Sequence, residues 1–425
     1  KKAKRRIVIA SLYLGTGSLE QDLVEAIRHA CKSAKESGTG DFEVHILLDY
    51  VRGSRGQDVT SRTMLTPLLE EFKDVVSVYL YHTPHLRGML RQYIPQRFNE
   101  VIGLNHMKIY LFDDSFIISG ANLSDQYFVN RQDRYVLFKD CAELADFFTN
   151  VVKTVGKFSF LLKPDDTTCL YPGWNAHPYD DEDNGKTYIE KARQEVLNFL
   201  QSVKSSSTTI TNSDLDTCVY PLIQMGPFGI DSDEKCMKRL FHSTPEGDTV
   251  YLASGYFNLT EQYKNIIVHE SEANYKILSA SPQVNGFFGA SGIAGKVPDT
   301  YTAISRKFFQ TVCYHDQENR VQLMEYYRDK WTFHVKGLWY YSQGNNLPHM
   351  SIVGSSNFGY RSVYRDLECQ VAIVTTNSQL QQQLKEEQEG FYEKTKLVTA
   401  ETFQQPDRFV PYWVRLLVPL VKKFF

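Results

Sequence analysis

The sequence predicts an α/β protein made of two similar halves, with mixed, largely parallel sheets flanked by helices. Apolar segments of strand length alternate with amphipathic segments of helical period, which is typical of α/β folds. The strand, glycine turn and helix expected at 7–27 are echoed at 250–267. With 425 residues, 42% of them hydrophobic, the chain is long enough for two or three domains with sizeable cores.

In the first half we expect strands to alternate with helices. The strands are expected at 7–14, 42–50, 75–81 and 135–138. The helices are expected at 18–34, 60–73 and 142–155. Ser18 and Gln21 predict a capping box at the start of the first helix. The first two strands are joined through this helix, so we expect them to pair in parallel.

The second half repeats this order after a connection that is rich in Pro, Asp and Gly, and an amphipathic helix opens it. A glycine-rich stretch at 285–296 contains two phenylalanines, which predicts a mobile loop over a binding cleft or at a lipid surface. We divide the chain into an N-terminal half at 1–162, a connecting segment at 163–186, a C-terminal half at 187–408 and a tail at 409–425.

The composition argues against several kinds of protein. The formal net charge of −3 provides no general attraction to nucleic acid. The seven cysteines include no CxxC pair, so they predict neither a zinc site nor a disulfide framework, and a reducing compartment is the simpler interpretation. The sequence contains no apolar run of about eighteen residues, so no segment is expected to span a bilayer.

A motif in the first half returns in the second. In both copies His-x-Lys opens an apolar run, a second apolar run ends in a small-residue turn with an Asn, and a carboxylate follows eleven residues after that Asn. The first copy contains His106, Lys108, Asn122 and Asp133. The second copy contains His334, Lys336, Asn357 and Glu368. The spacing from His to Asn is sixteen residues in the first copy and twenty-three in the second, which fits a longer loop around 342–349.

These residue types suit phosphoryl transfer. Side chains alternate along a strand, so the His and Lys of each copy share one face. The carboxylate is expected to bond the imidazole Nδ1 of its own copy, which leaves Nε2 free to attack phosphorus. The second imidazole then moves protons, while the Lys and Asn groups stabilise charge on the oxygens without a metal. A single His-x-Lys is most often a solvated pair, so this interpretation depends on the repeat.

The motif resembles that of the phospholipase D superfamily, H-x-K-x4-D followed by a Gly-small-x-Asn turn. The first copy matches it with His106, Lys108, Asp113, Gly120 and Asn122. The second copy matches with His334, Lys336, Gly354, Ser355 and Asn357, and Tyr341 stands where its Asp is expected. Within the superfamily, nearly the whole chain is similar to the phosphatidylglycerophosphate synthases. The resemblance implies two phospholipase D-like halves about a pseudo-two-fold axis, with His106 and His334 at a central cleft.

The same resemblance implies a reaction. CDP-diacylglycerol and sn-glycerol 3-phosphate would give phosphatidylglycerophosphate and CMP through a phosphatidyl-histidine intermediate, in phosphatidylglycerol and cardiolipin biosynthesis. His106 would be the nucleophile, because its motif is more complete, and His334 would assist the leaving phosphate and then deprotonate the hydroxyl. The reverse assignment is the alternative. The resemblance also implies a catalytic role for Asp113, which is the Asp of the motif.

The resemblance also implies where the protein works and with what. It implies no cofactor, no metal and no nucleic-acid partner. It implies a peripheral protein on the matrix face of the mitochondrial inner membrane, and the oligomeric state stays open. The tail at 409–425 combines apolar bulk with cations and no acid, which is typical of a segment in the interface of an anionic membrane. A docked hydrophobic terminus is the alternative.

Selectivity for glycerol 3-phosphate requires cations beside the cleft. Arg52 and Arg55 follow a predicted strand, at the sheet edge where ligands commonly bind in α/β folds, and a solvated pair is the alternative. Three further arginines, Arg131, Arg361 and Arg365, lie between each Asn and its carboxylate. Ser355, in the motif turn, is a further candidate for substrate binding.

Three other functions fit parts of the sequence. The first is a phosphodiesterase of the same superfamily that hydrolyses phospholipid or nucleic acid. The second is another CDP-alcohol transferase, such as a phosphatidylserine synthase. The third is a non-catalytic membrane scaffold, which only Tyr341 favours.

Overall fold

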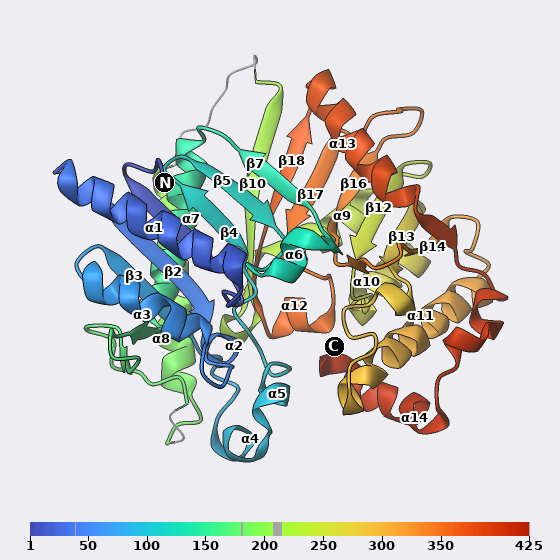
Figure 1. Cartoon of the computed structure of the whole chain (residues 1–425). Helices are drawn as coiled ribbons and strands as arrows, with labels where there is room; N and C mark the ends of the chain where they lie inside the picture. The colour runs from blue at the N-terminus through green and yellow to red at the C-terminus, as the bar shows by residue number, and fades with distance from the viewer. Residues whose placement is uncertain (39, 180–181, 207–214, 425) are drawn as a thin grey trace.

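The computed structural model describes residues 1–38, 40–179, 182–206 and 215–424. The chain forms two α/β lobes side by side, each with one large sheet and helices packed against it (Figure 1). The predicted fold class, an α/β protein of two similar halves with mixed sheets, is confirmed.

Among the described residues the first sheet has the strand order β7-β5-β4-β1-β2-β3-β8-β9. Its strands are β1 (Arg6–Ala10), β2 (Glu43–Asp49), β3 (Val76–Tyr81), β4 (Ile109–Phe112), β5 (Ser115–Ser119), β7 (Tyr135–Phe138), β8 (Phe160–Leu162) and β9 (Thr168–Leu170). The second sheet has the order β11-β10-β18-β17-β16-β12-β13-β14-β19. Its strands are β10 (Thr217–Met225), β11 (Ile230–Asp231), β12 (Thr249–Ser254), β13 (Asn274–Ala280), β14 (Val321–Tyr326), β16 (Lys336–Tyr341), β17 (Met350–Gly354), β18 (Leu367–Thr375) and β19 (Thr395–Leu397).

The two sheets share one topology. The run β7-β5-β4-β1-β2-β3 in the first sheet corresponds to β18-β17-β16-β12-β13-β14 in the second. In each sheet only the last three strands of this run pair in parallel, and the other pairs are antiparallel. The expectation of largely parallel sheets is therefore wrong. Parallel neighbours need a crossover, whereas β4 and β5, like β16 and β17, follow each other through a turn and must pair antiparallel.

Helices cover the faces of both sheets. The longer ones are α1 (Ser18–Glu36), α3 (Ser61–Glu71), α7 (Ala142–Lys157), α8 (Lys186–Ser206), α9 (Ser232–Ser243), α11 (Val297–Tyr314), α13 (Ser378–Tyr392) and α14 (Tyr412–Val421). The short ones are α2 (Tyr50–Gly53), α4 (Gly88–Tyr93), α5 (Gln96–Asn99), α6 (Asp125–Val129), α10 (Glu261–Asn265) with the π-helix η2 (Ile266–Glu270), and α12 (Tyr360–Tyr364). None of the described helices is both long and apolar enough to cross a membrane.

The capping box predicted at Ser18 is not formed. Gly17 is the N-cap of α1 and makes no side-chain cap, because Ser18 is already the first helical residue. A capping box is found instead at α3, where Thr60 and Thr63 bond each other's backbone N–H groups.

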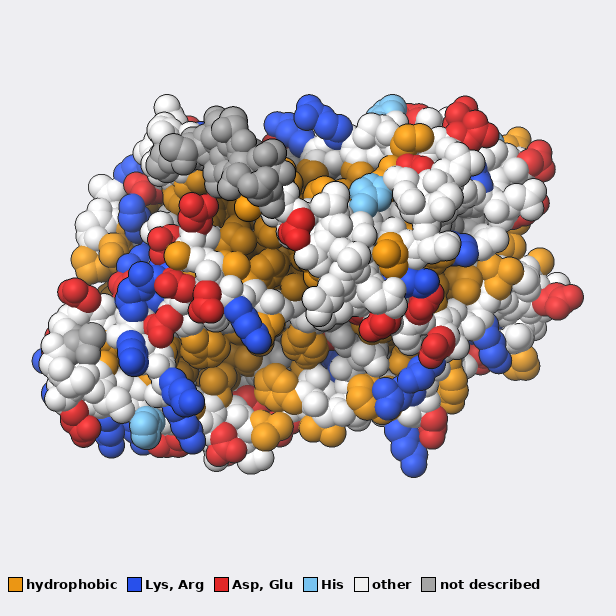
Figure 2. All heavy atoms as spheres, turned by 90° about the horizontal axis from the view of Figure 1, so that it is seen from above, with side chains coloured by type: hydrophobic (Ala, Val, Ile, Leu, Met, Phe, Trp, Pro, Cys, Tyr) orange, Lys and Arg blue, Asp and Glu red, His pale blue; other side chains and the backbone are white. Residues whose placement is uncertain are grey.

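The two halves share a hydrophobic core. One buried cluster contains Phe148 of α7, Ala192 of α8 and Val371 of β18. α8 packs against α7 of the first half, although the sequence analysis assigned α8 to the second half. The segment 163–186 was expected to be a connection, and it is only partly one, because it contributes β9 to the first sheet. Seen from above, hydrophobic side chains gather in a hollow near the middle of the surface (Figure 2).

Arg134, which follows the short strand β6 (Arg131–Gln132), ties the halves together. Its buried guanidinium donates to the carbonyl of Ile352 at 2.8 Å and to Ser351 Oγ at 2.9 Å, and it forms an ion pair with Glu387 at 2.8 Å. It also lies 4.1 Å from the ring centroid of Trp339. These contacts connect the first half to β17, β16 and α13 of the second.

We expect Arg134→Met to lower the free energy of unfolding by about 3 kcal/mol or more, because it removes several buried charge-assisted bonds at once. Lys157→Met is the control: its half-exposed ion pair with Glu195 should contribute less than about 1 kcal/mol. Urea unfolding followed by circular dichroism measures both. Equal losses in the two variants would contradict this role for Arg134.

Candidate active site

The two copies of the motif meet at one cavity between the lobes. His106, Asn122, His334 and Asn357 all line this active-site cavity, whose volume is about 460 Å³. The elements that surround it are α6 and α12, the start of α11 and the C-terminal helix α14, near the end of the chain in Figure 1. Two imidazoles that lie far apart in the sequence therefore face one cavity.

Each imidazole is held by the carboxylate of the other half. His106 Nδ1 lies 3.0 Å from both carboxylate oxygens of Glu368. His334 Nδ1 lies 2.7 Å from Asp133 Oδ2. The sequence interpretation paired each carboxylate with the His of its own copy, and this part of it is wrong.

Backbone bonds between the halves explain the exchange. The N–H of His106 donates to the carbonyl of Leu367 at 2.8 Å, directly before Glu368. The N–H of His334 donates to the carbonyl of Gln132 at 2.8 Å, directly before Asp133, where β15 (Thr332–Phe333) pairs with β6. Each His is thus placed beside the residue that precedes the other half's carboxylate.

Burial keeps both imidazoles neutral. Desolvation lowers the pKa of His106, although Glu368 opposes this shift. Desolvation, together with the charges of Lys336 and Arg131, lowers the pKa of His334 well below its ordinary value. With Nδ1–H donated to a carboxylate, a neutral imidazole presents the Nε2 lone pair to the cavity, which is the form that attacks phosphorus or accepts a proton.

The carboxylates differ from each other. Burial raises the pKa of Asp133 to about 6, with Lys336 opposing the shift. Burial also opposes ionisation of Glu368, but the charge and hydrogen bond of His106 hold the pKa of this carboxyl below its ordinary value. Glu368 is therefore the more firmly ionised of the two at neutral pH.

The motif lysines lie fully buried beside the imidazoles. Lys108 Nζ donates to the carbonyl of His106 at 2.7 Å, and Lys336 Nζ lies 3.0 Å from both the carbonyl and Nε2 of His334. A Cβ on Gly120 would lie 3.0 Å from Lys336 Cδ, so this glycine of the first copy gives room to the lysine of the second. Burial lowers the pKa of Lys108 to about 7 and that of Lys336 to about 8.

These two lysine pKa values predict a pH dependence of the affinity for a phosphate group. A phosphate group binds the protonated ammonium form, so affinity should be full below about pH 7 and should weaken as pH rises through about 7 and 8. The dissociation constant of a soluble phosphodiester with a poor leaving group, measured by calorimetry across this range, tests it. Lys108→Met should remove the lower part of the dependence, and a flat profile in the unaltered protein would contradict the assignment.

The two motif asparagines provide amide groups at the cavity. Asn122 Nδ2 donates to Tyr127 Oη at 2.9 Å, and the Oδ1 atoms of Asn122 and Asn357 are buried without a hydrogen-bond partner in the described structure. The residue five positions after each Asn also lines the cavity, as Tyr127 in the first half and Ser362 in the second. Buried amides with unused bonding capacity suit a polar ligand that enters the cavity.

Four of the five predicted arginines line the cavity. Arg52 and Arg55 approach Glu100 at 3.6 and 2.8 Å. The other two are Arg131 and Arg361, and Arg131 donates to Thr332 Oγ1 at 3.0 Å while Arg361 pairs with Asp366 at 3.2 Å. The cavity therefore has cations from both halves.

Three predicted site residues lie elsewhere. Asp113, at the turn between β4 and β5, accepts from the backbone N–H groups of Lys4 and Arg5 at 3.0 and 2.7 Å, so it anchors the start of β1. Arg365 stacks on Phe424 at 4.2 Å outside the lining of the cavity. Ser355 is fully buried, and its Oγ bonds the backbone of Cys369. The motif spacing could not separate side chains that face the cavity from those that hold the turn behind it.

Several lining residues were not predicted from the sequence. The rings of Tyr127 and Tyr256 meet His334 edge-on, with centroids 5.1 and 5.5 Å away. Trp413 of the tail also lines the cavity, and so does Phe287 of the glycine-rich stretch, which was expected over a binding cleft or at a lipid surface. The shared offset of five residues after each motif Asn could have identified Tyr127, whereas nothing local in the sequence marks Tyr256.

Comparison with solved structures defines the class of protein. Phosphatidylserine synthase from Haemophilus influenzae aligns with a TM-score of 0.73 at 20% identity, covering 100% of this chain and 91% of that one. This similarity establishes the fold. The duplicated His-x-Lys motif and this fold define a protein of the phospholipase D superfamily.

Curated relatives define the family. The mitochondrial CDP-diacylglycerol–glycerol-3-phosphate 3-phosphatidyltransferase of Homo sapiens is 50% identical over 445 residues, covering 100% of this chain and 79% of that protein. The enzyme of the same name from Saccharomyces cerevisiae is 33% identical, covering 99% and 84%. No protein-family model matches the sequence. This chain belongs to the CDP-diacylglycerol–glycerol-3-phosphate 3-phosphatidyltransferase family.

Proposed function

We propose that this protein transfers the phosphatidyl group of CDP-diacylglycerol to the primary hydroxyl of sn-glycerol 3-phosphate, giving phosphatidylglycerophosphate and CMP. The names of its relatives specify these two substrates. The observation that carries the proposal is the pair of neutral imidazoles at one cavity, each bonded at Nδ1 by a buried carboxylate, with two buried lysines beside them.

In the first step His106 Nε2 attacks the phosphorus that bears the diacylglycerol. A P–N bond forms, the bond between this phosphorus and the oxygen of CMP breaks, and CMP leaves with the electron pair. Lys108 and Lys336 stabilise the charge on the phosphoryl oxygens and on the leaving phosphate, and Glu368 stabilises the imidazolium form of His106.

In the second step the glycerol hydroxyl attacks the same phosphorus. His334 Nε2 takes the hydroxyl proton, the P–N bond breaks, and His106 regains its lone pair. Asp133 stabilises the imidazolium of His334, which then releases its proton to solvent. Arg52, Arg55, Arg131 and Arg361 are the candidates to hold the phosphate of the acceptor, because they line the same cavity.

The cavity must exclude water, because a phosphohistidine ester would otherwise hydrolyse. Aromatic side chains from four segments line it, and they are Tyr127, Tyr256, Phe287 and Trp413. Their position supports a transferase over a hydrolase of the same superfamily.

A peripheral position on a membrane follows from the lipid substrate. Exposed apolar side chains lie on α4, on the stretch after η3 (Pro282–Val284) and on α14, and they are Met89, Leu90, Tyr93, Phe287, Phe288, Tyr412, Trp413, Leu416, Leu417 and Leu420. α4 and α14 lie at the same end of the molecule, on either side of α5 and the end of the chain (Figure 1). We propose that this end rests on the matrix face of the mitochondrial inner membrane, as the mitochondrial names of the animal relatives and the cations of the tail suggest.

Purified protein incubated with CDP-diacylglycerol and one alcohol at a time tests the reaction. CMP release that requires glycerol 3-phosphate, and not serine or phosphatidylglycerol, is expected. Release of CMP at the same rate without any alcohol would show a hydrolase and would overturn the proposal.

A further inference from the structure

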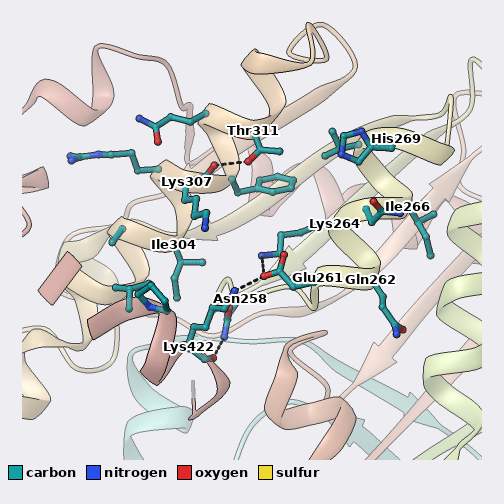
Figure 3. A pocket seen from close by; sticks show the side chains of 18 of the residues that line it. Asn258, Glu261, Gln262, Lys264, Ile266, His269, Ile304, Lys307, Thr311 and Lys422 are labelled. Atoms are coloured by element: carbon teal, nitrogen blue, oxygen red, sulfur yellow. Dashed lines mark hydrogen bonds and ion pairs between the residues drawn. The ribbon is translucent and has the colours of Figure 1, made fainter. Parts of the chain in front are cut away.

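A second cavity lies entirely in the C-terminal half. α9, α10 with η2, α11 and α14 surround it, and its volume is about 1130 Å³ (Figure 3). None of its lining residues lines the active-site cavity. A volume of this size is ample for a drug-sized or headgroup-sized ligand.

The second cavity carries an excess of positive charge. Its lining cations are Lys238, Lys264, Arg306, Lys307, Arg415 and Lys422, against the two acids Glu261 and Glu270. Glu261 is shared, because Lys264 and Lys422 both bond its Oε1, at 2.9 and 2.7 Å. One carboxylate therefore neutralises only one of these two ammonium groups.

Lys307 increases this excess. Figure 3 shows its side chain extending into the second cavity from α11, on the side that faces Lys264 and Glu261. Its Nζ has no hydrogen-bond or ion-pair partner within the part of the chain that the structure describes. Burial lowers the pKa of Lys264, and the neighbouring charges of Lys422 and Lys307 lower it further. An anion among these three ammonium groups would relieve their repulsion.

α14 connects the second cavity to the proposed membrane surface. Arg415, Val418, Pro419 and Lys422 line the second cavity, whereas Trp413, Val414, Leu417, Val421 and Phe424 line the active-site cavity. The helix is therefore a wall between the two. Its remaining side exposes Tyr412, Leu416 and Leu420, so the cations of the second cavity lie beside side chains suited to the acyl region of a bilayer.

We propose that the second cavity is a non-catalytic site for the phosphate headgroup of an anionic phospholipid, whose acyl chains lie along the exposed apolar side of α14. The charge of the cavity fits a phosphate anion, and the neighbouring apolar side chains favour a lipid over free phosphate. The inference rests on the proposed membrane position of this end of the molecule, but not on the proposed reaction.

Binding at this site would also hold the wall of the active-site cavity in place. Asn258 Nδ2 donates to the carbonyl of Lys422 at 2.6 Å, which fixes the end of α14. The next residue, Leu259, forms a β-bridge with Gly359, two residues after the motif Asn357. A lipid held by Lys264, Lys307 and Lys422 therefore stabilises the docked position of α14.

Protection of lysines from chemical acetylation tests the site directly. The His106→Gln variant is used, so that turnover is absent and the result does not depend on the proposed reaction. It is mixed with phosphatidylcholine vesicles, with vesicles that also contain phosphatidylglycerol, or with inorganic phosphate, and the acetylation of each lysine is followed by mass spectrometry. Lys235 is the internal control, because it lies on α9, pairs with Asp231 and does not line the second cavity.

We expect phosphatidylglycerol vesicles to slow acetylation of Lys307 at least about fivefold relative to phosphatidylcholine, the effect of one cation at an anionic lipid surface, with Lys235 unchanged. If the acetylation of Lys235 slowed equally, the effect would be a diffuse one of the charged surface, and the proposed site would be overturned. Protection by inorganic phosphate alone would overturn its assignment to a lipid. Equal acetylation rates of Lys307 in all three mixtures would overturn both the site and its assignment to a lipid.

A pair of variants supplies a second measurement. Lys307→Gln and Lys235→Gln remove the same charge from different places on the C-terminal half. Flotation with phosphatidylglycerol vesicles should show binding about fivefold weaker for Lys307→Gln and little changed for Lys235→Gln. Equal weakening of the two variants, or none in either, would contradict the proposal.

Discussion

His106→Ala is expected to abolish the covalent phosphatidyl-enzyme and to lower CMP release by about 10⁶-fold, the loss typical of removing a catalytic nucleophile. His106 meets the requirements for this role, because burial keeps it neutral and Glu368 bonds its Nδ1, and the choice of His106 over His334 rests on its more complete motif. His334→Ala should still form the adduct, but transfer to glycerol 3-phosphate should slow by about 10²- to 10⁴-fold, the range for a lost general base.

The measurement is a single-turnover reaction with radiolabelled CDP-diacylglycerol, quenched without acid and separated from free lipid. His29→Ala, at an exposed position on α1, is the matched control and should behave as the unaltered protein. Adduct in His106→Ala and none in His334→Ala would reverse the two roles. No adduct in any form of the protein, with CMP still released, would exclude a phosphohistidine.

Glu368→Gln is expected to slow formation of the adduct by about 10³- to 10⁴-fold, although Glu368 belongs to the half that contains His334. The reason is the exchanged pairing, in which Glu368 orients His106 and stabilises its imidazolium. An amide in place of an orienting carboxylate favours the wrong tautomer, which costs up to about 10⁴-fold in comparable sites. Asp133→Asn should instead leave adduct formation intact and slow only its transfer to the acceptor.

Separate measurement of the two half-reactions distinguishes the pairings. Asp113→Asn is the control, because Asp113 bonds the backbone at the start of β1 and should affect stability rather than either rate. If Asp133→Asn blocked adduct formation while Glu368→Gln left it unchanged, the carboxylates would act within their own halves and the exchanged pairing would have no functional role.

Much of the fold could be predicted because it depends on local periodicity. The strand at 135–138 and the helix that begins at Ala142 lie where the pattern placed them. The β-strands at 7–14 and 42–50 do pair in parallel. The direction of the outer strands was not predicted, because it depends on whether a turn or a crossover joins neighbours in the sheet, and the apolar pattern of a strand does not show this.

Among the site residues, residue type and spacing identified the imidazoles, lysines and amides, but not their partners. Asp113 and Ser355 share the motif with His106 and Asn357, yet they hold turns behind the cavity. The tail was predicted to lie at a membrane interface, and the structure adds that Trp413 lines the active-site cavity.

The sequence by itself determined that the chain is duplicated, that each half carries one His-x-Lys pair with an Asn and a carboxylate, and that this chemistry suits phosphorus. These conclusions follow from alternation along a strand and from spacing, which are local properties of the backbone. Only the tertiary structure decided that His106 bonds Glu368 and His334 bonds Asp133. That choice is made by backbone bonds between the halves, at Leu367 and at Gln132, and contacts over more than two hundred residues leave no local pattern in a single sequence.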